Sequence, residues 1–363
     1  MRDMSTPQIE WGQGTAYDLF MSLVVLHRPG DFGVRGAWAA GVRARLSPED
    51  RDVLESSQLL WHVPVHWIYT LPEPQDATTA LLALGQVPAS ERVRLLALGP
   101  DVCGEMVELF EEVAQKGAWT EADLAALQAT CQPVLEHGES KKPPTPKKLA
   151  EMLDLWVRAE EFGEQYLAAL RNYQEAFFAE EEKRIRPALR TALERAQELA
   201  DELALLDLLE ELTQGVRLDA PPEGNELVLV PSFWSTPLLY MGIAGEGCLV
   251  WLFGARPSDA SLVPGEVIPE TLLRALKALS DPTRLRILRD LAQETLTPAQ
   301  ISRRLRLRAP TVTHHLKILR LAGLVQLTLG DKELPGSYAT RQEAVSVACD
   351  SLQSFLRHEG HDS

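Results

Sequence analysis

The spacing of hydrophobic and polar residues divides the first two thirds of the chain into two helical regions. Between residues 16 and 135, apolar positions follow helical spacing in short stretches that Pro and Gly separate, which predicts a series of short packed helices. Residues 149–212 are rich in Ala, Leu, Glu and Arg and predict two or three long helices, interrupted only at Pro187. The polar, Pro-rich segment 136–148 (EHGESKKPPTPKK) predicts a linker or long loop between these regions.

A strand-like pattern follows the helices. Three short apolar runs bounded by Gly and Pro predict a small sheet, at 226–231 (ELVLVP), 237–241 (PLLYM) and 248–253 (CLVWLF). The glycines of 242–247 (GIAGEG) have GxxGxG spacing, whereas a dinucleotide-binding loop requires GxGxxG followed by a helix. We therefore predict a hairpin turn at 242–247.

Helical spacing returns in the last third of the chain, where the helix starts are sharply marked. Residues 270–279 predict one helix, and Asp281, which precedes a Pro, is an N-cap that starts the next. Residues 297–300 (TPAQ) match a capping box, and Pro310 begins a further helix. The inward face of this last helix carries Val312, Leu316 and Leu319.

Two short helices joined by a tight turn form a helix-turn-helix, whose second helix fits the major groove of DNA. The tight turn here is 306–309 (RLRA). Residues 324–329 and 337–340, joined by the stretch 330–336, predict a β-hairpin that would act as a wing beside the helices. The pattern therefore predicts a winged helix-turn-helix domain.

Two segments of this domain resemble a known family. LKALSDPTRLRILRDL and ISRRLRLRAPTVTHHLKILRLAGLV, within a stretch of about seventy residues, look like the ArsR family of winged helix-turn-helix repressors. The resemblance implies a homodimer that pairs through the first and last helices of the domain and reads a roughly twofold-symmetric operator. Residues 342–357 would supply that last helix. Ala309 stands where many relatives have a polar residue, which leaves fewer direct base contacts.

Charge alters this picture only when it is counted by segment. The whole chain has a formal net charge of −16, which by itself argues against nucleic acid as a partner. Residues 270–341 contain 13 Lys and Arg against six Asp and Glu, a net charge of +7, so the rest of the chain carries −23. A basic domain adjoins a strongly acidic body, as expected of a chain that binds DNA through one face.

Ten side chains are the predicted DNA contacts. The arginines at the end of the first helix of the motif and in the turn would bind phosphates, with Arg308 also a groove reader; a solvated helix end is the alternative. Thr311 and Thr313 can bond to phosphate or base, and His314 to a guanine acceptor or phosphate. For His315, packing and DNA contact are equally open. The ten are Arg303, Arg304, Arg306, Arg308, Thr311, Thr313, His314, Lys317, Lys332 and Arg341.

The sequence predicts neither a metal site nor a cofactor. Metal-sensing relatives have a thiolate pair at the start of the first helix of the motif, where this chain has Thr297 and Ala299. The last helix, which holds the family's second metal site, offers Glu343, Cys349 and Asp350. His62 and His66 are four residues apart, but Pro64 between them disfavours a regular helix, and we predict that both belong to a packed core.

Composition indicates a folded protein, and the remaining motifs lie in the body. Hydrophobic residues make up 45% of the chain and charged residues 24%, as in folded proteins. Four cysteines without a CxxC pair, and the lack of a signal peptide or a long apolar run, predict a cytoplasmic protein with no membrane partner. The charge run 180–184 (EEEKR) predicts a solvated helix face. All eight tryptophans lie outside the DNA-binding domain, where they fill a core or line an effector pocket.

The chain as a whole predicts a mainly α (α+β) protein. We expect a helical N-terminal subdomain over residues 1–138, long helices and a small sheet over 149–265 that bind an effector or dimerise, and the winged helix-turn-helix over 266–363. The predicted function is a transcriptional regulator, a repressor that binds an inverted repeat in double-stranded DNA as a homodimer. We expect no enzyme, because the body lacks GxSxG, HExxH, Walker and dinucleotide motifs. An enzyme or an architectural protein tethered to DNA is the alternative.

Overall fold

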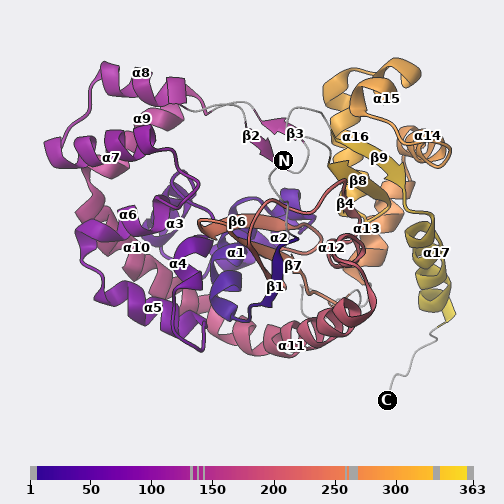
Figure 1. The fold of residues 1–363 in the computed structure, drawn as a ribbon, viewed down its shortest axis with the longest axis horizontal. Coiled ribbons are helices and arrows are strands. Elements are labelled where there is room, and N and C mark those ends of the chain that lie inside the picture. Colours follow the sequence, from indigo (N-terminus) through magenta and orange to yellow (C-terminus); the bar gives the residue numbers. More distant parts are fainter. Residues whose placement is uncertain are drawn as a thin grey trace.

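Most of the chain is helical, and its helices wrap around a small sheet with the C-terminal domain at one side (Figure 1). The structure is a computed structural model that describes residues 6–130, 134–136, 139–141, 144–257, 260, 269–329 and 336–357. The predicted mainly α (α+β) class is confirmed. In these ranges no helix combines the length and the apolar character that crossing a membrane would require.

The N-terminal helices begin with α1 (Thr15–His27), in which every residue from Thr15 to Leu26 is buried. A helix without a polar face belongs to the centre of a domain. The predicted series of short helices follows it: η1 (Pro29–Phe32), α2 (Gly36–Arg43), α3 (Pro48–Ser57), α4 (Val65–Tyr69), α5 (Ala77–Gln86), α6 (Ala89–Ala97), α7 (Gly104–Lys116) and α8 (Glu121–Thr130). Of these, η1, α2, α4 and α5 contact α1, whereas α7 and α8 pack with the helix over residues 146–157.

A second series of helices follows, as predicted for residues 149–212. It consists of α9 (Pro146–Val157), α10 (Ala159–Tyr173), the single π-helical turn η2 (Gln174–Phe178), α11 (Ala179–Glu202) and α12 (Leu205–Leu212). Pro187 lies inside α11 and does not interrupt it, so that expectation was wrong. Proline removes one hydrogen bond from the helix, and the burial of Ile185 and Leu189 on either side of Pro187 compensates for that loss.

The predicted linker between the two series contains regular structure. The strands β2 (Val134–Glu136) and β3 (Glu139–Lys141) pair antiparallel, and Thr145 caps α9 through a hydrogen bond from the Lys148 N–H. The helical pattern does break here, as predicted. The expectation of a loop was wrong for β3 and for Glu136, and the expectation of a helix was wrong for Val134 and Leu135, because main-chain pairing does not require apolar side chains.

The charge run at the start of α11 is partly buried, contrary to the prediction of a solvated face. Glu181 and Glu182 are only 8% and 6% exposed. Glu182 accepts a hydrogen bond from the Thr15 hydroxyl, and Glu181 forms an ion pair of 2.5 Å with Arg184. The prediction failed because α11 packs against the start of α1, which supplies a partner that the local sequence does not reveal.

The central sheet has the strand order β1-β5-β7-β6. It contains β5 (Glu226–Ser232) and β7 (Cys248–Gly254), which match two predicted runs, and β6 (Tyr240–Gly245), which shares only Tyr240 and Met241 with the predicted run 237–241. β6 is antiparallel to β7. The predicted hairpin is confirmed, although its turn is shorter than expected, since Gly242 to Gly245 belong to β6. The strand β1 (Gln8–Trp11) pairs parallel with β5 and was not predicted.

A buried carboxylate joins α1 to this sheet. Asp18 accepts hydrogen bonds from Ser232 Oγ at 2.8 Å, from the Trp234 N–H at 2.9 Å and from the Phe233 N–H at 3.3 Å. Burial raises the pKa of Asp18 to about 7, and these three donors oppose the shift. The turn that follows β5 is therefore held against the most buried helix of the protein.

We predict that Asp18 makes the stability of the fold depend on pH. Its pKa is raised on folding, so the folded state keeps a proton that the unfolded chain loses, and this stabilisation disappears as pH rises towards 7. Between pH 5 and 6.5 the free energy of unfolding should fall by about 2 kcal/mol more in the wild type than in Asp18→Asn. Urea denaturation at several pH values measures this difference, and parallel curves for the two proteins would contradict the prediction.

The C-terminal domain follows the predicted order of elements. Its helices are α13 (Glu270–Leu279), α14 (Pro282–Leu291), α15 (Pro298–Leu305), α16 (Ala309–Leu321) and α17 (Gln342–Arg357), and β8 (Val325–Leu329) pairs antiparallel with β9 (Ser337–Thr340) as the wing. Buried residues of this domain, among them Ile287, Leu316 and Tyr338, form a hydrophobic core of their own. A separate core runs through the body and includes Phe20, Trp156 and Val230.

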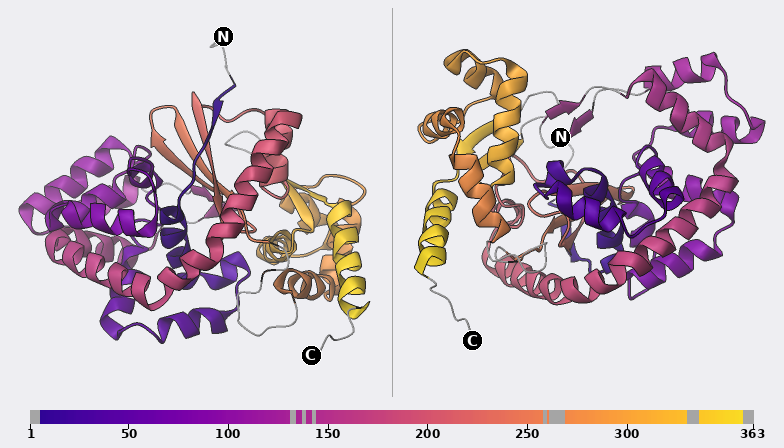
Figure 2. Two further views of the ribbon diagram at one scale, coloured as in Figure 1. Left: turned by 90° about the horizontal axis from the view of Figure 1, so that it is seen from below. Right: turned by 180° about the vertical axis from the view of Figure 1, so that it is seen from behind.

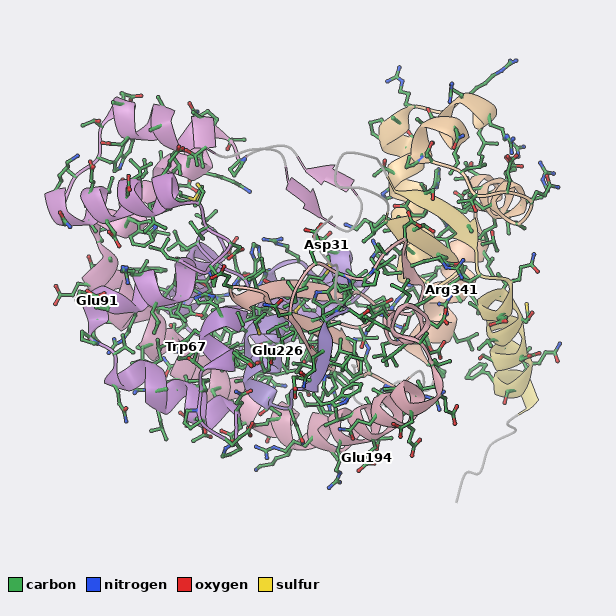
Figure 3. The ribbon with its side chains drawn as sticks, viewed as in Figure 1. Asp31, Trp67, Glu91, Glu194, Glu226 and Arg341 are labelled. Carbon is green, nitrogen blue, oxygen red and sulfur yellow. The ribbon has the colours of Figure 1, made fainter. Side chains whose placement is uncertain are left out.

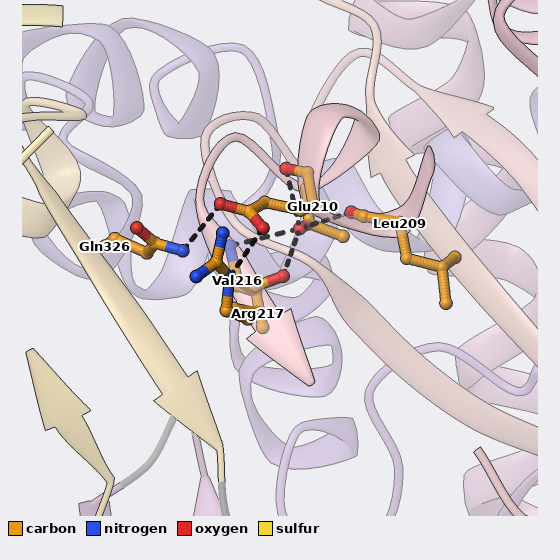
Figure 4. A network of polar contacts seen from close by, with 6 residues as sticks. Leu209, Glu210, Val216, Arg217 and Gln326 are labelled. Atoms are coloured by element: carbon orange, nitrogen blue, oxygen red, sulfur yellow. Dashed lines mark hydrogen bonds and ion pairs between the residues drawn. The ribbon is translucent and has the colours of Figure 1, made fainter. Parts of the chain in front are cut away.

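A strand of the body extends the sheet of the wing. β4 (Val216–Leu218) pairs parallel with β8, so the sheet has the order β4-β8-β9. Side chains complete this contact: Gln326 donates to Glu210 at 2.6 Å, and Glu210 also accepts from Arg217 at 2.8 Å (Figure 4). Nothing in the sequence predicted this pairing, because β4 has only three residues and its partner lies more than 100 positions along the chain.

Candidate nucleic-acid interface

Local capping interactions set the geometry of the helix-turn-helix. Asp281 Oδ1 accepts hydrogen bonds from the N–H groups of Thr283 and Arg284, at 2.8 and 2.9 Å, and starts α14. At the start of α15, Thr297 and Gln300 form the predicted capping box, in which each side chain accepts from the backbone N–H of the other. These caps satisfy N–H groups that a helix end would otherwise leave unpaired.

The turn between α15 and α16 depends on a left-handed residue. Arg306 has φ 53° and ψ 42°, and its N–H donates to the Ser302 carbonyl. An arginine is uncommon in this conformation, which glycine adopts more easily. The outcome is a sharp turn that carries Arg306 and Arg308, both exposed, next to the first turn of α16.

The recognition helix α16 presents two different faces. Val312, Leu316 and Leu319 are buried in the domain core, as the sequence predicted. On the opposite side Thr311 and His314 are exposed, whereas Thr313 is half-buried. The exposed first turn matches the part of a recognition helix that reaches base edges in the major groove.

An exposed arginine group borders this helix. Arg303 and Arg304 at the end of α15 join the two arginines of the turn. Arg304 forms an ion pair of 2.6 Å with Glu294, and both side chains are exposed. Within the described residues Arg303, Arg306 and Arg308 form no ion pair, so their charge is available to phosphates.

The remaining predicted contacts lie in different surroundings. Lys317, 41% exposed, forms an ion pair with Asp31 of η1 in the body. Arg341 donates from Nη1 to the backbone carbonyls of Gln214 and Gly323, at 2.9 and 3.2 Å, and so stabilises the approach of β4 to the wing. Asp31 and Arg341 both lie along the side where the body meets the C-terminal domain (Figure 3). Lys332 lies outside the described residues.

His315 is placed for packing more than for DNA. Its Nδ1 is buried without a hydrogen-bond partner, and burial lowers its pKa, which favours the neutral imidazole. His314 beside it is exposed. Of the two interpretations that the sequence left open for His315, the geometry favours packing.

Possible ligand residues elsewhere in the body do not converge. His66 Nε2 bonds to the Leu95 carbonyl at 2.9 Å, and His62 bonds to Arg28, so the two histidines have separate partners. In the part of the chain that the structure describes, no group of three His, Cys, Asp or Glu side chains could hold a metal ion. Of the tryptophans, Trp61, Trp67, Trp156, Trp234 and Trp251 are buried in the cores.

Comparison with known proteins bears on the C-terminal domain alone. A family model described as a helix-turn-helix domain matches residues 279–328, which run from the end of α13 to β8. No curated protein matches the chain. The C-terminal part is therefore a helix-turn-helix domain, a class of fold that binds DNA.

We predict that the contact between Asp31 and Lys317 restrains DNA binding. Asp31→Asn removes the ion pair and releases Lys317 for a phosphate, so affinity for DNA at low salt should rise several-fold. The slope of log affinity against log salt should become steeper by roughly one. Fluorescence anisotropy over a salt series measures both quantities.

Glu194→Gln is the matched control for this substitution. Glu194 is exposed on α11 and labelled in Figure 3, and its substitution makes the same change in net charge. Adding Lys317→Ala to Asp31→Asn should remove the gain in affinity. Equal affinities of Asp31→Asn and Glu194→Gln would show that the ion pair has no influence on binding.

Proposed function

We propose that the protein is a transcriptional regulator that binds specific double-stranded DNA as a homodimer and represses transcription from its operator. The observation that carries the proposal is the exposed first turn of α16, bordered by the arginine group of α15 and the turn. Thr311 and His314 would read base edges, and the arginines would bind the flanking phosphates. The acidic body would disfavour DNA contact elsewhere on the surface.

The proposal of a homodimer is supported by α17. At 100° per residue, Ala344, Ala348, Leu352 and Phe355 form an apolar face, and Val347 and Leu356 lie at its two edges. Contacts with α13 cover only part of this face, since Val347 and Leu356 are 62% and 70% exposed. Figure 2 shows α17 on the outer side of the domain, away from the body. A second copy could pack there, in line with the resemblance to ArsR repressors.

The effector is part of the same proposal. The domain is docked on the body through β4 and through the pair Asp31–Lys317, so a ligand that favours this docked arrangement would alter DNA affinity. We propose no catalytic role for the body. Turnover of a substrate would favour the alternative of a tethered enzyme, and equal binding to every DNA sequence would favour an architectural protein.

The first test is whether binding is specific and depends on α16. Selection by the full chain from a random double-stranded DNA library should enrich an inverted repeat that the protein protects from nuclease. The double variant Thr311→Ala/His314→Ala should bind that repeat at least tenfold more weakly, because each base contact contributes about 1–3 kcal/mol of discrimination. Its affinity for unrelated DNA should stay within about twofold, since phosphate contacts are retained.

Gln115→Ala/Gln128→Ala, with both substitutions at exposed positions of α7 and α8, is the control for this experiment. It should bind both DNAs as the wild type does. Enrichment of no sequence, or an unchanged ratio of specific to unrelated binding in Thr311→Ala/His314→Ala, would contradict the proposed function.

The second test addresses the homodimer. Val347→Glu/Leu356→Glu places charges at the edges of the apolar face, where a partner would have to bury them, so the dissociation constant of the dimer should rise at least tenfold. Ser346→Glu/Gln353→Glu adds the same charge to the polar face of α17 and should remain dimeric. Sedimentation velocity distinguishes the two results, and a monomeric wild type would refute the dimer.

A further inference from the structure

Two arginines with buried N–H donors lie at the contact between the body and the C-terminal domain, near enough that the charge of Arg274 lowers the pKa of Arg256. Arg256 follows β7 in the body and is 8% exposed, and its Nη2 donates to the Thr236 carbonyl at 2.8 Å. Arg274 lies on α13, and its Nη1 donates to the carbonyl of Leu321 at 3.2 Å. We call Arg256 and Arg274 the joint arginines.

The joint arginines have more donors than partners. Nη1 of Arg256, and Nε and Nη2 of Arg274, are buried and have no hydrogen-bond partner. A guanidinium stays charged at neutral pH and carries five N–H donors, so unpaired donors in the interior are unfavourable. Native proteins seldom leave such groups unsatisfied unless a ligand, ion or water completes them.

The charges around the joint arginines do not balance. Glu270 is the nearby carboxylate, and it already forms an ion pair of 3.2 Å with Arg35. Glu181 already forms an ion pair with Arg184. Burial and the charge of Arg274 lower the pKa of Arg256 to about 9, which still leaves it charged at pH 7. The described residues around the joint thus have an excess of positive charge.

Contact with an aromatic ring stabilises the guanidinium of Arg256 in part, but it provides no acceptor for Nη1. The guanidinium carbon lies 5.7 Å from the centre of the Phe233 ring, and that of Arg184 lies 4.8 Å from the same ring. Such a cation–π contact engages the face of the guanidinium plane. The in-plane N–H of Nη1 remains without an acceptor.

We propose that the joint arginines form a binding site for a small oxyanion, the carboxylate or phosphate group of a metabolite. Two oxygens on one group match the paired N–H donors of a guanidinium, and arginine is well suited to such recognition. The anion would accept from Nη1 of Arg256 and from Nε and Nη2 of Arg274. It would also supply the negative charge that Glu270 alone does not provide.

The position of this site gives the anion a structural consequence. Arg256 belongs to the body and Arg274 to the DNA-binding domain, so an anion between them links the two. A Cβ on Gly33 of the body would lie only 2.8 Å from Arg274 Nε, so the surfaces are already in close contact there. Arg274 also bonds to Leu321, the last residue of α16. The role of the anion rests on the proposed function. It acts as an effector that stabilises the docked arrangement in which Asp31 binds Lys317, and it thereby lowers the affinity for DNA.

The test of binding uses the full chain in anion-poor buffer with sodium phosphate, sodium acetate or sodium chloride added at equal ionic strength. Phosphate or acetate should raise the Tm saturably by a few degrees, and the more effective of the two identifies the group recognised. Chloride should have no saturable effect. Arg256→Gln/Arg274→Gln should abolish the response, whereas Arg190→Gln/Arg195→Gln, with both arginines exposed on α11, should retain it.

The buffer without added anion provides a second, independent readout. There Arg256→Gln/Arg274→Gln should melt at a higher temperature than the wild type, because it removes two charges whose buried donors are only partly satisfied. A lower Tm would mean that the chain already compensates these guanidiniums, and it would overturn the site. Responses that are equal for chloride, phosphate and acetate would also overturn it.

Measurements of DNA affinity distinguish the existence of the anion site from its proposed role as an effector site. With anion bound, wild-type affinity for the selected repeat should fall several-fold, and Arg256→Gln/Arg274→Gln should not respond. A saturable Tm response with unchanged DNA affinity supports the site and refutes the effector role. A Tm response in a protein that selects no DNA sequence supports the site and refutes the proposed function.

Discussion

The hydrogen bonds of the buried Asp18 carboxylate are the constraint on which the arrangement of the body depends. α1 is buried on all sides, so its one acidic side chain must find donors inside the protein. Ser232 and the N–H groups of the next two residues provide them, which holds the turn after β5 in one conformation. That turn presents Phe233 to two arginines and Thr236 to Arg256, and thus links the centre of the body to its surface.

The contact between body and DNA-binding domain combines main-chain and charged interactions. On one side, β4 pairs with β8, and the main-chain hydrogen bonds between the two strands fix how the body and the domain are aligned there. On the other side the contacts are electrostatic: Asp31 of the body pairs with Lys317, and Arg35 of the body pairs with Glu270. The half-exposed pair Asp31–Lys317 contributes little free energy, so this contact can respond to ligands while the strand pairing holds.

Much of the candidate site could be predicted because its signals are local. Asp281, Thr297 and their following prolines define helix starts through bonds within a few residues, and the helices begin where those caps predict. The inward positions of α16 follow from helical periodicity alone. The surroundings of Lys317 and Arg341 could not be predicted, because their partners come from residues 31 and 214 of the body.

The sequence by itself determined the two series of helices, the strands β5 and β7, the helix-turn-helix with its wing, and the basic character of that domain beside an acidic body. Capping and periodicity depend on residues that are close together in the chain, and composition does not depend on the order of residues at all. The tertiary structure alone decided the pairing of β1 with β5 and of β4 with β8, the burial of Glu181 and Glu182, and the burial of unpaired donors on Arg256 and Arg274. Each of these requires segments that are distant in the chain to pack together, and the packing determines which polar groups find partners.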